Sequence, residues 1–209
     1  MISADLNVIL PEIVLSLFAI LALLLAVYTT KDATAGLMVW ATSGVMVLLA
    51  IWIGMTGGGA TRIAFNGLFI EDGFARFAKV TVLLSAAAVL IMSEAYMKKR
   101  GLLRFEYPML VALSVVGMMM MVSAGDLMTL YMGLELQSLA LYVIASLRRD
   151  SVKSTEAGLK YFVLGALSSG LLLYGVSLVY GYAGTTQFTG VMSVAKTGET
   201  SIGLLFGIV

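Results

Sequence analysis

The sequence contains no cysteine and no histidine among its 209 residues. Without thiolate or imidazole ligands, these residues cannot hold an iron–sulfur cluster, a structural zinc ion or a histidine-ligated haem. They also cannot form a disulfide bond or use a thiol or an imidazole in catalysis. We therefore expect no cofactor and no metal ion in this chain, so that any redox chemistry must be carried by partner subunits.

Charged residues are also scarce, at 12% of the chain against about 25% in soluble domains. Hydrophobic residues make up 60%, and the mean hydropathy is +1.01. This composition indicates an integral membrane protein that is surrounded by a lipid bilayer. The net charge is only +1, and the charges lie in connectors without forming a basic stripe. We therefore expect no nucleic-acid partner.

The hydrophobic runs predict an all-α fold, a polytopic bundle of transmembrane helices. A helix that crosses a bilayer needs roughly 20 apolar residues. The pattern gives six complete helices, at about residues 6–28, 35–55, 71–96, 107–123, 126–147 and 154–182, and the start of a seventh at 202. Because the seventh run is too short to span a membrane, we expect the chain to be the front part of a longer protein. Residues 1–106 would hold the first three helices with a basic connector, and residues 107–209 the remaining helices.

The basic residues predict the orientation of these helices. The connectors after the first, third and fifth helices contain most of them, namely Lys31, Lys98, Lys99, Arg100, Arg104, Arg148, Arg149 and Lys153. The opposite side has only Arg62, Lys196 and, near the start of the third helix, Arg76 and Lys79. Connectors rich in lysine and arginine face the cytoplasm, so the N-terminus is predicted on the outer side.

The charged residues near the outer ends of the first and third helices are interpreted as interfacial. Glu12 stands in the first turns of its helix, where a negative charge suits the helix dipole, and a functional role is the alternative. Asp72 and Arg76 are four residues apart, a spacing at which they can pair. Lys79 is predicted to extend toward the same interface, in preference to a place on a proton path.

Glu135 stands near the middle of the helix that begins at residue 126. Nine residues of helix place it about 13 Å from the outer surface, too deep for a short side chain to reach water. An ionised group at that depth costs on the order of 2.5–3.5 kcal/mol, and such residues are candidates for function. The protonation of a desolvated carboxylate responds to a nearby cation, as a proton relay requires. The alternative is a structural glutamate that joins helices by hydrogen bonds.

Lys160 stands early in the next helix, roughly 6–9 Å from its cytoplasmic end. It would lie on the order of 10 Å from Glu135 along the membrane normal, so water would have to connect the two groups. The alternative is an ion pair near the interface with Glu156, four residues earlier. Small residues that follow, Gly165, Ala166, Ser169 and Gly170, predict close helix packing around this region.

Two segments carry a family resemblance. LYMGLELQSLALY at 130–142 and LKYFVLGALSSGLLLYG at 159–175 closely resemble the subunit N family of bacterial NADH–quinone oxidoreductase, which is respiratory complex I. YGYAGTT at 180–186 fits the same family. These subunits are antiporter-like. The resemblance implies a full protein of more than a dozen helices with two inverted repeats, each containing a broken helix.

The resemblance also implies roles for the two charged residues. Glu135 matches the glutamate of the family's fifth helix and Lys160 the lysine of its sixth, so both would act in proton translocation. In the family the glutamate works with a lysine on the broken seventh helix, a position beyond Val209. The chain would hold the helices that precede the first repeat and about half of that repeat.

The implied function is proton translocation across the bacterial inner membrane, coupled to electron transfer from NADH to quinone. Flavin mononucleotide and iron–sulfur clusters are then expected in partner subunits, and NADH on peripheral ones. The expected neighbours are another antiporter-like subunit and small membrane subunits. Two alternatives remain, a membrane subunit of a cation/proton antiporter and a scaffold that translocates nothing.

Overall fold

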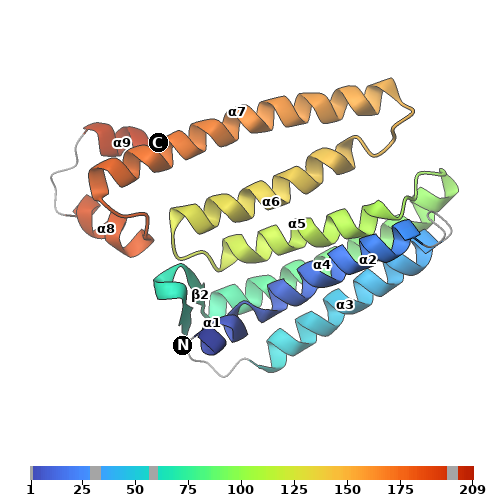
Figure 1. The fold of residues 1–209 in the computed structure, drawn as a ribbon, viewed down its shortest axis with the longest axis horizontal. Coiled ribbons are helices and arrows are strands. Elements are labelled where there is room, and N and C mark those ends of the chain that lie inside the picture. The colour runs from blue at the N-terminus through green and yellow to red at the C-terminus, as the bar shows by residue number, and fades with distance from the viewer. Residues whose placement is uncertain (1, 29–33, 57–60, 197–201) are drawn as a thin grey trace.

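The computed structural model describes residues 2–28, 34–56, 61–196 and 202–209, and most of them are helical (Figure 1). The helices are α1 (Ile2–Val8), α2 (Leu10–Tyr28), α3 (Ala35–Met55), α4 (Gly73–Lys99), α5 (Glu106–Val122), α6 (Leu127–Ala145), α7 (Val152–Ala183), α8 (Phe188–Lys196) and α9 (Ile202–Ile208). Helices α2, α3, α4, α6 and α7 are long and apolar enough to cross a membrane, whereas α5 is an apolar helix of 17 residues. The predicted all-α transmembrane bundle is confirmed.

The long helices lie side by side, roughly antiparallel from one to the next (Figure 1). Helix α3 packs on α4, and α5 contacts α2, α4 and α6. Their shared core includes the fully buried residues Leu15, Met46, Leu83, Val115 and Met119. This core contains residues from both sides of residue 106. The predicted division of the chain at that residue stays a prediction. Helix α7 forms the outer edge and contacts α6, α8 and α9.

Two glycines allow the helices α5 and α6 to approach each other closely. A Cβ on Gly117 would lie 2.6 Å from the Gly133 carbonyl oxygen, and a Cβ on Gly133 would lie 2.8 Å from that of Gly117. No side chain fits at either distance. The backbones can therefore meet here, which fixes the height of α6 against the core.

The first predicted helix is broken, because α1 ends at Val8 and α2 begins at Leu10. Pro11 lacks a backbone N–H, so the hydrogen-bond ladder cannot continue without interruption across it. The ladder resumes where the N–H of Ile13 donates to the carbonyl of Ile9 at 3.1 Å. A prolyl ring suits the first turn of a new helix.

A small hairpin between α3 and α4 was not predicted. Strands β1 (Arg62–Ala64) and β2 (Phe69–Glu71) pair antiparallel across the short 3-10 helix η2 (Phe65–Gly67). Three consecutive residues of η2 have positive φ angles, which turn the chain sharply; Gly67 has the largest, 91°. Three-residue strands are too short to give an alternating pattern in the sequence.

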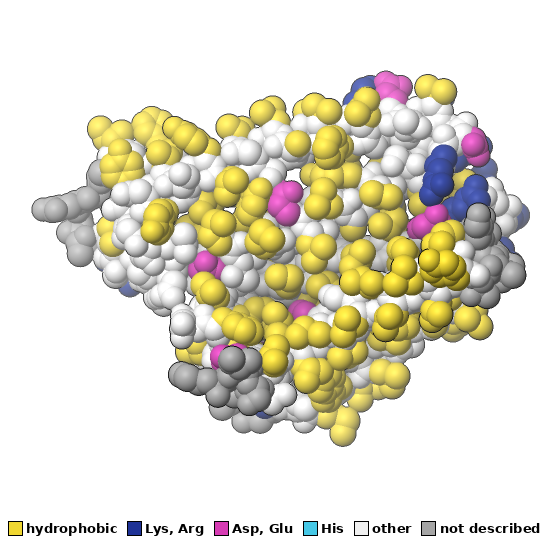
Figure 2. All heavy atoms as spheres, viewed as in Figure 1, with side chains coloured by type: hydrophobic (Ala, Val, Ile, Leu, Met, Phe, Trp, Pro, Cys, Tyr) yellow, Lys and Arg dark blue, Asp and Glu magenta, His cyan; other side chains and the backbone are white. Residues whose placement is uncertain are grey.

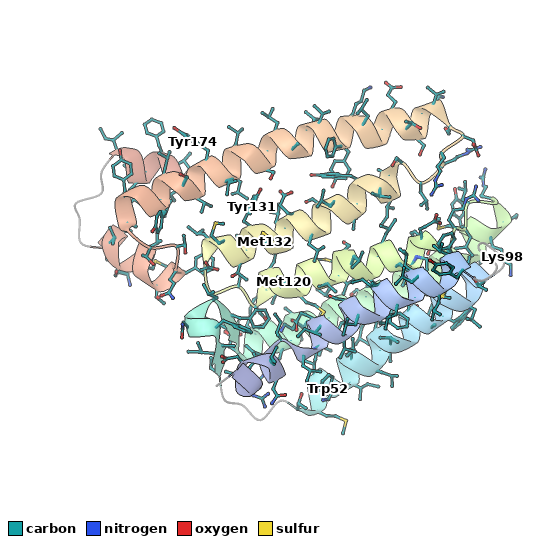
Figure 3. All side chains as sticks on the ribbon, viewed as in Figure 1. Trp52, Lys98, Met120, Tyr131, Met132 and Tyr174 are labelled. Atoms are coloured by element: carbon teal, nitrogen blue, oxygen red, sulfur yellow. The ribbon has the colours of Figure 1, made fainter. Side chains whose placement is uncertain are left out.

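Lys and Arg side chains gather at one end of the molecule, where the α4–α5 and α6–α7 connectors lie (Figure 2). Lys98 marks this end (Figure 3). The N-terminus and the hairpin lie at the other end (Figure 1). Lys31, which also entered the charge argument, lies outside the described residues. The arrangement agrees with the charge argument for orientation, and the side on which the N-terminus lies stays a prediction.

Candidate functional site

Helix α6 carries Glu135. Polar contacts at the start of α6 hold the helix in place. The Asp126 carboxylate accepts a hydrogen bond from the N–H of Thr129 at 2.8 Å and another from the Thr186 hydroxyl at 3.2 Å. The N–H of Leu127 donates to the carbonyl of Thr186 at 3.0 Å. These bonds cap α6 and attach it to the turn that follows α7.

Glu135 lies in the middle of α6, and its side chain is half-buried. Its Oε1 atom is buried and accepts no hydrogen bond from any of the described residues. Buried side-chain oxygens are nearly always hydrogen-bonded in folded proteins. Glu135 Oε1 thus lacks the hydrogen-bond partner that a buried carboxylate oxygen usually has, and the described helices supply none.

The interface between α6 and α7 is polar and aromatic on either side of Glu135. The Tyr131 hydroxyl lies 3.0 Å from the Ser169 hydroxyl, and Tyr131 is directed from α6 toward α7 (Figure 3). Further along, the Tyr142 ring packs edge-on against Tyr161 at 4.8 Å and fills the space beside Gly165. Close packing was predicted at Gly165 and is confirmed there, whereas it was also predicted at Gly170, where no described atom lies within 4 Å of a Cβ.

Lys160 does not lie beside Glu135. It is exposed, and its Nζ lies 2.6 Å from Glu156 Oε1, one helical turn earlier on α7. This is the interfacial pair that was considered as the alternative. The functional role predicted for Lys160 is not tested by this contact, because an exposed pair is weak and exchanges readily.

The structure brings together two residues that the sequence argument left apart. Lys79 Nζ lies 2.7 Å from Glu12 Oε1, and the side chains are 0% and 3% exposed. The predictions that Glu12 is interfacial and that Lys79 extends toward the interface are wrong. A signal was present in the sequence: Lys79 falls in line with Ala75, Leu83 and Ala87, which are all buried. A lysine on such a stripe points inward.

Asp72 does not pair with Arg76 by its side chain. Its carboxylate accepts a hydrogen bond from the N–H of Ala75 at 2.7 Å and so caps the start of α4. An aspartate directly before a helix gives one of the otherwise unpaired backbone N–H groups a hydrogen-bond acceptor. This bond stabilises the protein more than an exposed ion pair would.

Comparison with known proteins shows what these helices are similar to. Residues 124–209 match the family described as NADH:quinone oxidoreductase/Mrp antiporter, TM. Over 209 residues the chain is 66% identical to NADH-quinone oxidoreductase subunit N of Jannaschia sp. (strain CCS1) and 63% identical to that of Rhodobacter capsulatus. The chain is similar to subunit N along its whole length. The resemblance that α6 and α7 carry is confirmed. The alignments cover 100% of this chain and 43% of each relative, so the chain spans less than half of their length.

Solved structures share the same fold. A chain of respiratory complex I from Thermus thermophilus with bound aureothin superposes with a TM-score of 0.70 and 25% identity, covering 95% of this chain and 43% of that one. A chain of the membrane-bound sulfane sulfur reductase, an archaeal respiratory membrane complex, gives 0.71 and 21%, covering 99% and 42%. One from the Mrp complex of Dietzia sp. DQ12-45-1b gives 0.63 and 22%, covering 99% and 40%. The last two show the fold alone.

Proposed function

We propose that this chain is part of a proton-translocating membrane subunit of NADH–quinone oxidoreductase, with Glu135 as a proton carrier. The observation that carries the proposal is the half-buried Glu135 carboxylate in the middle of α6, whose Oε1 has no donor among the described residues. Similarity to subunit N over the whole chain supports it. The chain would act with other membrane subunits in a bacterial inner membrane. Flavin, iron–sulfur clusters and the NADH site would belong to peripheral partners, and quinone would be the substrate of the complex.

The mechanism is electrostatic. A change of charge in a neighbouring subunit alters the pairing of Glu135 with a lysine, and the two groups then change their proton affinities in opposite senses. Lys160 stands nearer the basic end of the molecule and pairs with Glu156. A proton that passes between Lys160 and Glu135 would therefore move through water along the α6–α7 interface, past Tyr142 and Tyr161. The Tyr131 and Ser169 hydroxyls would continue the route on the other side of Glu135.

The experiment that tests this proposal is the substitution Glu135→Gln in the complete complex, measured in native membrane vesicles. We expect lost proton pumping per NADH oxidised and slowed quinone reduction, in a complex that assembles fully on a native gel. Glu106→Gln is the matched control, since Glu106 is also a partly buried acid in this chain but pairs with Arg149 at the connector end. If Glu135→Gln pumps and turns over as the wild type does, the carboxylate is a packing group and the proposal fails.

A cation/proton antiporter is the second candidate, because the matching family description names both classes. The two predict different phenotypes on removal of the protein. Loss of a complex I subunit abolishes NADH oxidation that is sensitive to rotenone-type or piericidin-type inhibitors, whereas loss of an antiporter makes cells sensitive to salt. A scaffold that translocates nothing predicts that conservative changes at Glu135 alter assembly and leave coupling intact.

A further inference from the structure

A second pair of buried charges lies among the N-terminal helices, away from the α6–α7 interface. Glu12 of α2 and Lys79 of α4 form an ion pair of 2.7 Å. Both side chains are at least 97% buried, and neither takes part in the mechanism proposed above. Fully buried charges in a membrane protein are costly, so their presence calls for an explanation.

This ion pair has few further contacts. Apart from Lys79, no other described residue donates a hydrogen bond to the Glu12 carboxylate. The Lys79 ammonium has, besides Glu12, the face of the Phe69 ring at 4.8 Å from the centroid. A buried ion pair stabilises a fold only where further hydrogen bonds satisfy its remaining atoms, and apolar residues often serve the fold equally well. Stability alone does not account for this pair.

Glu71 connects the pair to the surface at the hairpin end. Its side chain is 8% exposed, and it lies on the same buried face of β2 as Phe69, whose ring faces the Lys79 ammonium. On its other side Glu71 lies 3.8 Å from Arg62, whose side chain is 47% exposed. Ionisable groups thus follow one another from Arg62 at the surface through Glu71 to the buried pair.

The strand that touches the pair also touches the start of α6. Phe69 lies on β2, whose Ile70 N–H donates to the carbonyl of Ser123 at 2.8 Å. The N–H of Gly125 in turn donates to the carbonyl of Leu68 at 2.9 Å. Helix α6 begins two residues after Gly125, so the backbone beside Lys79 is directly bonded to the turn that leads to Glu135.

We propose that Glu12 and Lys79 form a second proton-exchange site, which is reached from the hairpin end through Glu71. The elementary step moves a proton from the Lys79 ammonium to the Glu12 carboxylate, which leaves a neutral amine and a neutral carboxylic acid and changes no oxidation state. Burial favours this neutral form of the pair, because neutral groups do not bear the free-energy cost of desolvating a charge. Glu12 then passes its proton to Glu71, and a proton that returns through Glu71 and Glu12 restores the Lys79 ammonium. The inference rests on the proposed proton translocation, because only a chain that moves protons has use for such a site.

The first test replaces both charges at once. Glu12→Gln with Lys79→Met removes the ionisable groups and leaves no unpaired charge, so the double variant is expected to assemble better than either single variant. In native membrane vesicles we expect an assembled complex with a loss of proton pumping per NADH oxidised. Ser43→Ala is the matched control, because it removes a buried polar group of the same bundle that bonds only to the Ala87 carbonyl at 3.4 Å. Normal pumping by the assembled double variant overturns the proposal.

The second test covers the case in which the double variant does not assemble. Infrared difference spectra of the intact complex, oxidised against NADH-reduced, detect carboxyl groups that change protonation. We expect a carboxyl band of the wild type to shift in the conservative variant Glu12→Asp, and an unchanged spectrum overturns the proposal. The two proposals can be contradicted separately. Normal pumping by Glu135→Gln contradicts the proposed function. If Glu135→Gln loses pumping but the changes at Glu12 have no effect, only this further inference is contradicted.

Discussion

The Tyr131 hydroxyl of α6 lies 3.0 Å from the Ser169 hydroxyl of α7, one helical turn from Glu135. It joins two helices that otherwise meet mainly through apolar and aromatic contacts. Helix α7 is exposed along most of its length, and this hydrogen bond holds it against α6 together with the Tyr142–Tyr161 contact and the bonds of Thr186. Because it lies one turn from Glu135, it contributes to the placement of that carboxylate relative to α7.

Tyr131→Phe removes the bond and keeps the ring. Hydrogen bonds between transmembrane helices contribute about 0.6 kcal/mol on average and about 1.7 kcal/mol at most, so the complex should stay assembled and lose little thermal stability. Proton pumping per NADH oxidised should fall, if the hydroxyl lies on the route that Glu135 uses. Tyr174→Phe on α7 is the control, since that side chain is 64% exposed. Equal pumping in both variants would show that Tyr131 only packs.

Gly133→Val should prevent assembly of the subunit. A Cβ there would lie 2.8 Å from the Gly117 carbonyl oxygen and from the Met121 side chain, and backbone cannot yield as a flexible side chain can. Helix α6 would be displaced from α5, and overpacking typically costs about 1–3 kcal/mol or more. The check is the yield of intact complex on a native gel. Gly170→Val on α7 is the control, because nothing lies within 4 Å of a Cβ at that position, and its yield should match the wild type.

Asp126→Ala should destabilise the start of α6. The variant loses the cap on Thr129 and the hydrogen bond from Thr186, and loss of a cap alone costs about 0.5–2 kcal/mol. Because α6 is then less firmly held, we expect a lower melting temperature of the purified complex and faster proteolysis near the turn. Asp150→Ala is the control, because it removes an exposed carboxylate from the next connector. A melting temperature that drops equally for Asp150→Ala would contradict a specific role of the cap.

Much of the fold could be predicted because membrane spans follow from hydrophobic length alone. The positions of α3, α5 and α6 were predicted closely. The predicted C-terminal end of α4 lies three residues before the observed one. The break at Ile9 was missed because Pro11 was taken as a residue inside a single helix. The hairpin was missed because its strands are short. Glu135 could be singled out because a lone acid in the middle of a long apolar run is costly and therefore a candidate for function. The Glu12–Lys79 pair could not be found in the same way, because its partners are 67 residues apart and only the packing of α2 and α4 in the same bundle brings them together.

Topology offers a direct test of orientation, because the described chain has no native cysteine to interfere with labelling. Arg62→Cys at the hairpin end and Lys153→Cys at the basic end each introduce one thiol at an exposed position. In intact cells a membrane-impermeant maleimide that enters the periplasm should label Arg62→Cys and leave Lys153→Cys unlabelled until the inner membrane is opened. The reverse pattern would place the N-terminus in the cytoplasm and contradict the charge argument.

Lys160→Met separates a role in proton transfer from a role in the ion pair. The pair with Glu156 is exposed, so its loss should change the free energy of unfolding by no more than about 1 kcal/mol. If Lys160 carries protons, Lys160→Met lowers pumping per NADH oxidised while the complex remains assembled and equally stable. Glu156→Gln breaks the same ion pair and keeps the ammonium, so it should pump as the wild type does. Equal losses in the two variants would instead assign the effect to the pair, and normal pumping in both would leave Glu135 as the proton-carrying residue of the α6–α7 pair.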